Sequence, residues 1–192
     1  MLKIITGSAK GKRLATLEGE ATRPTSERIK EAIFSSIQFD VEGREVLDLF
    51  AGSGQMGLEA ISRGAASAMF VDNAKEAIDI VKQNAKSVGF FGNSRFLVSD
   101  YRNYIRKASG REIFDLIFID PPYALACCKE AVERIVAAGL ARPGAIFVLE
   151  GGEEDLDPES IGDTYRDFEI LKYRRYGQKT SVAILLYRGR RE

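Results

Sequence analysis

The sequence predicts an α/β fold: a doubly wound, mostly parallel seven-stranded sheet with an antiparallel last strand and a small N-terminal β-hairpin. Short apolar runs alternate with segments of helical spacing through the middle of the chain. The chain then closes with two β-like runs joined by a short turn. With 192 residues it is long enough for one domain. We therefore expect a single domain over residues 1–192, including an N-terminal extension over residues 1–22.

The central elements follow from the period of the apolar residues. The runs expected to be strands are residues 45–50, 68–72, 95–98, 114–120 and 145–150. The segments with helical spacing are residues 56–63, 74–88, 101–107 and 124–138. Several of the strand runs are almost continuously apolar, as expected for parallel strands that are covered on both faces. Strands that alternate with helices imply right-handed crossovers and a doubly wound sheet.

The two ends of the chain have a different pattern. Residues 168–175 and 180–187 are joined by only four residues, which predicts a hairpin and one terminal strand antiparallel to its neighbours. Near the start, residues 3–6 and 13–16 flank a stretch rich in glycine and lysine, which predicts a small hairpin. A helix is then expected over residues 27–37, with Thr25 or Ser26 as its N-terminal cap.

Composition excludes several classes of protein. No apolar run approaches the roughly 20 residues of a membrane helix, and the first residues lack the apolar region of a secretory signal, so a cytoplasmic protein is expected. The chain has no histidine, and its only cysteines, Cys127 and Cys128, are adjacent. Zinc therefore has no plausible ligand set, and catalysis by a histidine-based triad is excluded. We expect no metal.

Charge is balanced in total but uneven along the chain. The 28 basic and 28 acidic residues cancel, so there is no global signature of nucleic-acid binding. Residues 1–13 and 172–191 nevertheless carry four and seven basic residues and no acid. Each cluster fits either a solvated surface or a phosphate-binding face, and the second interpretation gains weight if both lie on one face.

A glycine-rich turn follows the first central strand. Gly52, Gly54 and Gly57 satisfy the pattern G-x-G-x-x-G between a predicted strand and a predicted helix, and Asp72 ends the next strand. Glycines let the backbone approach a ligand closely, and an acid at the second strand tip accepts hydrogen bonds from ribose hydroxyls. The pattern predicts an adenosine-containing cofactor, and both a nicotinamide dinucleotide and S-adenosylmethionine fit it. A structural turn without a ligand is the alternative.

The segment Asp120-Pro121-Pro122-Tyr123 follows a later strand and carries the chemistry. The prolines make the loop stiff and leave the Pro121 carbonyl without a competing local donor. The Asp120 carboxylate and this carbonyl suit the two N–H bonds of an exocyclic base amine, whose lone pair then points at an electrophilic methyl group. The Tyr123 ring suits stacking on the base. The alternative is a rigid turn in which Asp120 caps the next helix.

With these two motifs the chain resembles the class I S-adenosylmethionine methyltransferases that carry the (D/N)PP(Y/F) signature. More closely, it is similar to the bacterial family that methylates N2 of a guanine in 16S ribosomal RNA. The pieces that carry the resemblance are Ile4-Ile5-Thr6-Gly7 with Lys10-Gly11-Lys12-Arg13, Arg23-Pro24-Thr25-Ser26-Glu27-Arg28, Asp48–Gly54 with Gly57-Leu58-Glu59-Ala60, Asp120–Tyr123 and Gly177-Gln178. The first two, at the N-terminus, are what narrows the choice to this family. The signature tyrosine is Tyr123, where related guanine enzymes often have phenylalanine, so this residue does not fix the identity of the base.

The resemblance implies a role for each matching position. Those implied to bind S-adenosylmethionine are Asp48, Phe50, Ala51, Gly52, Gly54, Asp72, Asp100, Tyr101 and Thr25. Those implied to receive the target base are Asp120, Pro121 and Tyr123. Those implied to contact RNA or the substrate mouth are Lys10, Lys12, Arg13, Arg23 and Arg28. The implied partner is ribosomal RNA, naked or within a small subunit, and the expected state is a monomer.

Several other functions remain compatible with parts of the sequence. A methyltransferase for adenine N6 in nucleic acid, or for protein glutamine, would share the chemistry of the Asp120 motif. A nicotinamide-dependent oxidoreductase would share the glycine turn, but the chain offers no histidine acid and no room for a substrate domain. A non-catalytic RNA-binding protein with this fold would not need Asp120 and Gly54.

Overall fold

The computed structural model describes residues 2–16, 25–152, 155–156, 165–177 and 179–189. The chain forms two compact units, Met1–Tyr101 and Arg102–Glu192, and each is described by itself. Both contribute strands to a seven-stranded sheet. The single domain expected over residues 1–192 stays a prediction.

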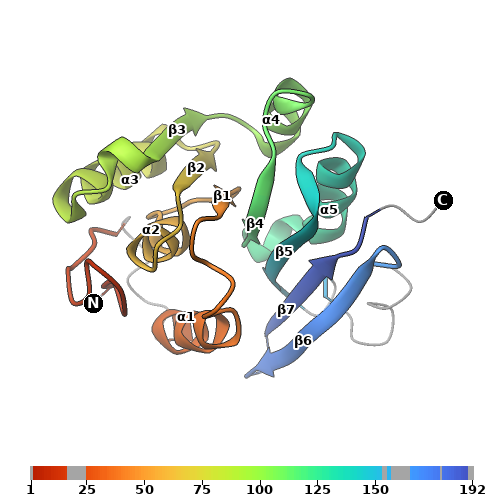
Figure 1. Cartoon of the computed structure of the whole chain (residues 1–192), viewed down its shortest axis with the longest axis horizontal. Coiled ribbons are helices and arrows are strands. Elements are labelled where there is room, and N and C mark those ends of the chain that lie inside the picture. Colours follow the sequence, from red (N-terminus) through yellow and green to blue (C-terminus); the bar gives the residue numbers. More distant parts are fainter. Residues whose placement is uncertain (1, 17–24, 153–154, 157–164, 178, 190–192) are drawn as a thin grey trace. The chain divides into compact units, whose positions relative to one another are not determined.

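The first unit holds three parallel strands in the order β3-β2-β1 (Figure 1). They are β1 (Glu45–Asp48), β2 (Ser67–Asp72) and β3 (Ser94–Val98). The pairing between β1 and β2 ends at Asp48 and Phe70, and the pairing between β2 and β3 ends at Asp72 and Val98. The three strands are parallel, so their carboxyl ends, and the loops that follow them, emerge at one edge of the sheet.

The helices of this unit are α1 (Thr25–Ser36), α2 (Gln55–Ser62) and α3 (Lys75–Val88), with a short 3-10 turn η2 (Phe91–Asn93). Helix α3 shows why the sequence folds this way. Its apolar residues Ile78, Val81 and Val88 share one face and are buried. Gly89 ends it at φ 89°, a left-handed conformation that glycine adopts without steric cost.

The chain before α1 forms an arm over residues 2–16, which we call the N-terminal arm. The predicted chain reversal is confirmed: the N–H of Ile4 donates to the Lys12 carbonyl at 2.9 Å, and the N–H of Gly11 donates to the Ile4 carbonyl at 2.9 Å. The two predicted strands are reduced to one bridge between Lys3 and Arg13. They stay short because the tip of the arm bonds to α2 instead, where the N–H of Ser8 donates to the Ser62 carbonyl at 2.8 Å.

The second unit holds the strand order β4-β5-β7-β6 (Figure 1). Its strands are β4 (Phe114–Ile119), β5 (Ala141–Gly151), β6 (Phe168–Tyr176) and β7 (Thr180–Tyr187). Strand β4 pairs with β5 in parallel, and β7 runs antiparallel to both β5 and β6. The predicted antiparallel terminal strand and closing hairpin are confirmed.

Helix α4 (Tyr101–Ala108) begins at the boundary between the units, and η3 (Tyr123–Leu125) and α5 (Cys128–Ala137) follow β4. A single helix over residues 124–138 was the wrong expectation. Ala126 lies at φ 40°, which an α-helix does not admit, so a 3-10 turn ends before α5 starts. The helix starts at Cys128, whose backbone N–H donates to both carboxylate oxygens of Asp155, at 2.8 and 3.1 Å.

The other boundaries differ from expectation by a few residues at most. Strand β1 ends at Asp48 rather than at residue 50, because the chain already turns at that point. Strand β5 begins at Ala141, four residues before the apolar run, because Ala141 pairs with Phe114 of β4. The mostly parallel α/β sheet predicted from the sequence is confirmed.

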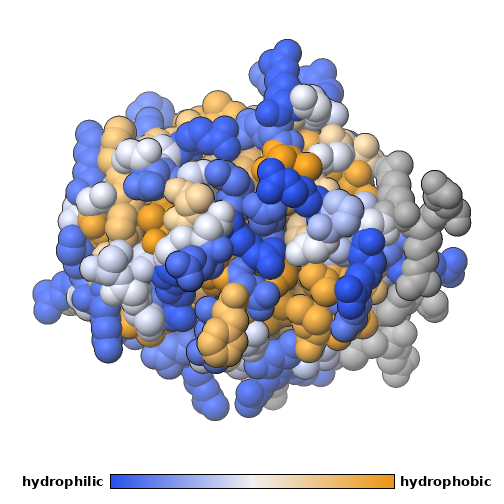
Figure 2. All heavy atoms as spheres, in the orientation of Figure 1, coloured by the Kyte–Doolittle hydropathy of each residue, from blue (hydrophilic) through white to orange (hydrophobic). Residues whose placement is uncertain are grey.

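In the view of Figure 2 hydrophilic side chains cover much of the visible face, with apolar side chains interspersed among them. Among the described residues no helix is long and apolar enough to cross a membrane.

Candidate functional site

The glycine turn lies where β1 passes into α2, in the first unit. Gly52 and Gly54 adopt φ 52° and 77°, a region where a β-carbon is strained. The N–H of Ala51 donates to the Val71 carbonyl at 3.0 Å, which ties the turn to β2. Gly54 is the N-cap of α2, and no side chain caps the helix from that position. The N–H of Gly54 donates to the Ala51 carbonyl at 2.6 Å, so the turn bends the backbone tightly from β1 into α2.

Close packing explains why two of the turn's positions are glycine. A β-carbon at Gly57 would lie 2.4 Å from Cε1 of Phe70, and one at Gly54 would lie 2.7 Å from Cγ1 of Val81. Both distances are far below van der Waals contact. Gly54 therefore serves both the turn and the packing of α3, whereas Gly57 lets α2 approach β2.

Two carboxylates hold this turn from different strands. Oδ2 of Asp48 accepts the N–H of Gly57 at 3.0 Å, and Asp48 is buried. Oδ2 of Asp72 accepts the N–H of Gly52 at 3.0 Å, and its Oδ1 accepts the N–H of Ala74 at 2.9 Å. A carboxylate has about four lone-pair sites, so Asp72 retains acceptor capacity for ribose hydroxyls. Asp48 holds the start of α2 through this bond, and the ligand contact implied for it stays a prediction.

Two aromatic rings lie together near the same strand ends. The Phe50 and Tyr101 ring centroids are 5.2 Å apart, with an angle of 49° between the planes. The Ser99 N–H donates to the Asp72 carbonyl at 2.8 Å, and the Ser99 hydroxyl donates to the Asp100 carbonyl at 3.0 Å. The structure therefore gathers Gly52, Gly54, Asp72, Asp100 and the two rings around the carboxyl ends of β1, β2 and β3.

Asn84 of α3 bonds to this turn, and the sequence analysis did not identify it. It is buried, and its Nδ2 donates to the carbonyls of Ser53 at 2.9 Å and Ala15 at 3.0 Å. Its Oδ1 accepts the N–H of Ala15 at 2.8 Å. One amide thus ties the glycine turn to the N-terminal arm. The signal was a polar residue on the otherwise apolar face of α3, three residues after Val81.

A buried ionic group holds the N-terminal arm on α2. The Glu59 carboxylate, fully buried, accepts the N–H groups of Ile5 and Thr6 at 2.7 and 3.0 Å and Nε of Arg63 at 2.8 Å. Nζ of Lys30 lies 3.8 Å from it. Lys30 also donates to the Lys3 carbonyl at 2.7 Å, and burial lowers the pKa of its ammonium group. The arm is therefore anchored by groups that would be costly to leave unpaired.

The basic residues predicted to contact RNA differ in their exposure and in their hydrogen bonds. Lys10, Arg13 and Arg28 are exposed. Nζ of Lys12 donates to the Val88 carbonyl at 3.1 Å, so this cation sits at the C-terminal end of α3. Arg23 and the side chain of Thr25 lie outside the described residues.

The Asp120–Tyr123 segment lies in the second unit, immediately after β4. Asp120 is partly buried, Pro121 is buried and Pro122 is exposed. The N–H of Leu125 donates to the Pro122 carbonyl at 2.9 Å, which closes the turn over η3. Tyr123 begins η3, and its side chain is not among those described. The N–H of the first residue of α5 is taken by Asp155, so Asp120 is not the carboxylate bonded there.

Cysteine chemistry plays no visible part in this segment. Cys127 and Cys128 are both free and buried. Burial raises the pKa of the Cys128 thiol far above its ordinary value, which keeps it protonated and unreactive. Within the described ranges no group of three or more histidine, cysteine or acidic residues could hold a metal ion.

A comparison with protein families decides the relationship. The model of the family described as Conserved hypothetical protein 95 matches residues 2–185. The chain belongs to this family. It is 36% identical over 189 residues to a Bacillus subtilis (strain 168) protein named "Putative rRNA methyltransferase YlbH", covering 98% of this chain and 100% of that protein. It is 27% identical over 154 residues to "Ribosomal RNA small subunit methyltransferase D" of Escherichia coli (strain K12), covering 80% and 76% of the two chains.

A solved structure shares the fold of this member of the Conserved hypothetical protein 95 family. The structure titled "Putative methyltransferase yhhF from Escherichia coli" superposes with a TM-score of 0.84 at 24% identity, covering 98% of this chain and 99% of that one. At this identity the likeness shows a shared fold. The fold is that of the class I methyltransferases, as the sequence predicted.

Proposed function

We propose that this protein transfers a methyl group from S-adenosylmethionine to the exocyclic N2 of a guanine in small-subunit ribosomal RNA. The observation that carries the proposal is the Asp120-Pro121-Pro122-Tyr123 segment directly after β4, in a chain that also has a tight glycine turn between β1 and α2. Its relatives support methyl transfer to ribosomal RNA, because two of them bear that activity in their names. The choice of guanine N2 rests on the resemblance of the N-terminal motifs alone.

The first unit supplies groups that fit S-adenosylmethionine. This molecule brings a methyl group made electrophilic by a sulfonium centre. The Asp72 carboxylate has lone pairs for the ribose hydroxyls, and the turn at Gly52 and Gly54 leaves room for backbone contact. The Phe50 and Tyr101 rings offer apolar faces to an adenosine or methionyl portion. The carboxylate of Asp100, which precedes Tyr101 in the sequence, would accept a hydrogen bond from the adenine amino group.

The second unit supplies the acceptors for the target amine. An exocyclic amine is a weak nucleophile because its lone pair is delocalised into the ring. The Asp120 carboxylate and the Pro121 carbonyl would each accept one N–H, which favours a more tetrahedral nitrogen. Bound S-adenosylmethionine would supply the methyl group to this nitrogen, and its carbon–sulfur bond would break as the carbon–nitrogen bond forms. Its surplus proton passes to the Asp120 carboxylate or to water.

Labelled methyl transfer to unmodified ribosomal RNA and to small subunits, followed by mass-spectrometric mapping of the product nucleoside, tests the proposal. N2-methylguanosine is expected. N6-methyladenosine would refute the choice of guanine while leaving the Asp120 chemistry intact. If protein is labelled and RNA is not, the substrate would be a protein glutamine and not RNA. NADH binding without S-adenosylmethionine binding would overturn the cofactor.

The variant Asp120→Ala tests the chemistry. Loss of one oriented acceptor is expected to lower the rate of transfer by about 10²-fold or more, with cofactor affinity within a few-fold of the parent. Asp115→Ala is the matched control, because Asp115 lies on β4, which Asp120 directly follows, and pairs with Arg142 at 2.8 Å. Undiminished transfer by the Asp120 variant would discard the mechanism.

The exposed cations of the N-terminal arm are proposed to bind RNA phosphates. Changing Lys10 and Arg13 together to Ala is expected to weaken RNA binding and to reduce the slope of log K against log salt by roughly 0.7 to 0.9 for each phosphate that is no longer bound. Lys12→Ala is the comparison, because its amine already bonds the Val88 carbonyl. An unchanged slope for the double variant would mean that the arm has a structural role only.

A further inference from the structure

We propose that the closing hairpin of the second unit carries another RNA-binding surface, formed by Lys172, Arg174, Tyr176 and Lys179. We call it the β6 basic strip. It would bind phosphates of the RNA away from the target nucleotide. The inference rests on the proposed function, since it takes RNA as the substrate, and it names residues that the signature motifs do not include.

The strand register places the strip on one face of an edge strand. Strand β6 is the last in the strand order and pairs with β7, with Arg174 opposite Val182 and Tyr176 opposite Thr180. The irregularity in register lies between Ile170 and Lys172, before the strip begins. Side chains two residues apart share a face of a strand, at a spacing of about 7 Å. Lys172, Arg174 and Tyr176 therefore form a row.

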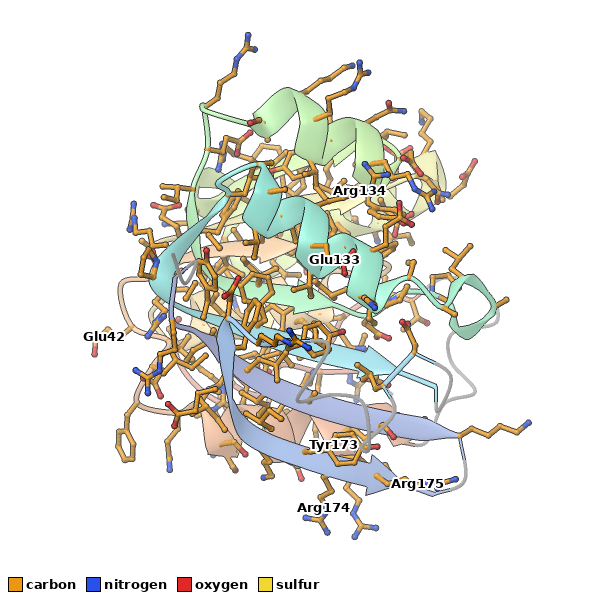
Figure 3. The ribbon with its side chains drawn as sticks, turned by 90° about the vertical axis from the view of Figure 1, so that its right-hand side faces the viewer. Glu42, Glu133, Arg134, Tyr173, Arg174 and Arg175 are labelled. Carbon is orange, nitrogen blue, oxygen red and sulfur yellow. The ribbon has the colours of Figure 1, made fainter. Side chains whose placement is uncertain are left out.

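Arg174 and Tyr176 form a stacked pair within this row. The guanidinium carbon of Arg174 lies 5.3 Å from the centroid of the Tyr176 ring, and the Arg174 side chain is exposed. Figure 3 shows the labelled Arg174 and Arg175 projecting from β6 near its C-terminal end. Stacking on an aromatic ring orients the guanidinium, whose planar fork of donors matches a phosphate. The exposed Lys179 adds a cation in the adjoining turn.

The hairpin that carries the strip is basic along its sequence. Residues 170–187 contain basic residues and no acid. At the far end of the hairpin Glu169 is paired with Arg188. The strip is thus a local concentration of positive charge in a chain of zero net charge, which favours a polyanion as its partner.

Charged side chains on an edge strand have another known use, since they prevent pairing with the edge of a second molecule. This explanation predicts that removal of the charges changes self-association and leaves RNA binding as it is. The stacked Arg174–Tyr176 pair favours RNA, because edge protection requires charge but no oriented guanidinium. Binding and self-association are therefore measured on the same variants.

The test compares Arg174→Ala/Lys179→Ala with a control that loses the same charge, Arg106→Ala/Lys107→Ala, whose residues are exposed at the end of α4. Affinity for an unmodified small-subunit RNA fragment is measured over a salt series. The strip variant is expected to bind at least about tenfold more weakly, with a slope smaller by roughly 1.4 to 1.8 because two phosphates are no longer neutralised. Its KM for RNA should rise with little change in kcat, and the control should match the parent.

Arg174→Lys separates shape from charge. It keeps the cation and loses the fork, so the salt slope should stay and the affinity should fall by a smaller factor. The inference is overturned if the strip variant binds RNA as the control does, or if only its self-association or its affinity for a ribosomal protein changes. A parent protein that neither binds RNA nor transfers methyl groups would instead refute the proposed function. Circular dichroism and cofactor affinity confirm that each variant is folded.

Discussion

Replacing Asn84 by Asp tests whether one buried amide holds the glycine turn. The substitution keeps the shape of the side chain and the acceptor that faces the Ala15 N–H. It removes the Nδ2 donor that bonds the Ser53 carbonyl at 2.9 Å and the Ala15 carbonyl at 3.0 Å. Both carbonyls then face a carboxylate oxygen. The turn and the N-terminal arm lose their shared tether.

The structure sets the expected magnitude. Leaving a buried acceptor without its donor costs about 1–3 kcal/mol, so two such losses amount to roughly 2–6 kcal/mol, with about 4 kcal/mol as the central expectation. That is a large share of the roughly 5–15 kcal/mol that stabilises an ordinary domain. Asn93→Asp is the control, because Asn93 is exposed and its Nδ2 donates once, to the Ala66 carbonyl at 3.1 Å. It should cost about 0.5–1 kcal/mol.

Urea unfolding followed by circular dichroism measures both free energies of unfolding. Calorimetric titration with S-adenosylmethionine measures the second effect. Ser53 lies between Gly52 and Gly54, so a looser turn should weaken cofactor binding, by about tenfold if the tether contributes about 1.4 kcal/mol to preorganisation. A stability loss below about 1 kcal/mol, or one equal to that of Asn93→Asp, would refute the reasoning about the amide.

Gly57→Ala should destabilise the protein by about 1–3 kcal/mol, because its β-carbon would lie 2.4 Å from a Phe70 ring atom. Gly92→Ala, with no atom within 4 Å of the added carbon, should stay within about 0.5 kcal/mol, and equal thermal midpoints would contradict this. Burial raises the pKa of the Cys128 thiol, so the unfolded chain ionises first and stability should fall as pH rises above about 9, by up to about 1.4 kcal/mol per pH unit. Cys128→Ala should show a shallower fall between about pH 9 and 10.5, and an unchanged slope would exclude the thiol as its source. Asp72→Asn should lower cofactor affinity by at least about tenfold, because an amide in place of the carboxylate that accepts the Gly52 N–H disturbs the turn. Calorimetric titration measures this affinity. Binding equal to that of the parent would count against a role for Asp72.

Short-range patterns in the sequence predicted the strands well. The alternation of apolar runs placed β2, β4 and β7 within one residue of their observed ends. The start of helix α5 was predicted wrongly, because it depends on the positive φ of Ala126 and on the carboxylate of Asp155, far along the chain. Propensity contains neither fact. A favourable helical composition cannot show where the backbone is forced out of the helix.

The residues of the candidate site divide in the same way. The glycine turn, Asp72 and the Asp120 segment were visible in the sequence because their chemistry needs particular residue types at fixed spacing. The tasks of Asn84, Glu59 and Lys12 were not. No sequence pattern assigned a task to Glu59, yet it is fully buried and accepts two backbone N–H groups of the N-terminal arm. Lys12 looked like a free cation, yet its amine bonds the end of α3.

The sequence by itself determined the fold class, the cofactor class that fits the glycine turn, and the kind of nitrogen that suits Asp120 and Pro121. These follow from local order along the chain: period, turn residues and motif spacing. Only the tertiary structure decided which polar groups are buried and what they hold. That information depends on interactions between residues far apart in sequence, such as the 69 residues that separate Ala15 from Asn84. Burial makes each of these interactions costly to break, and a local sequence pattern does not show which groups are buried.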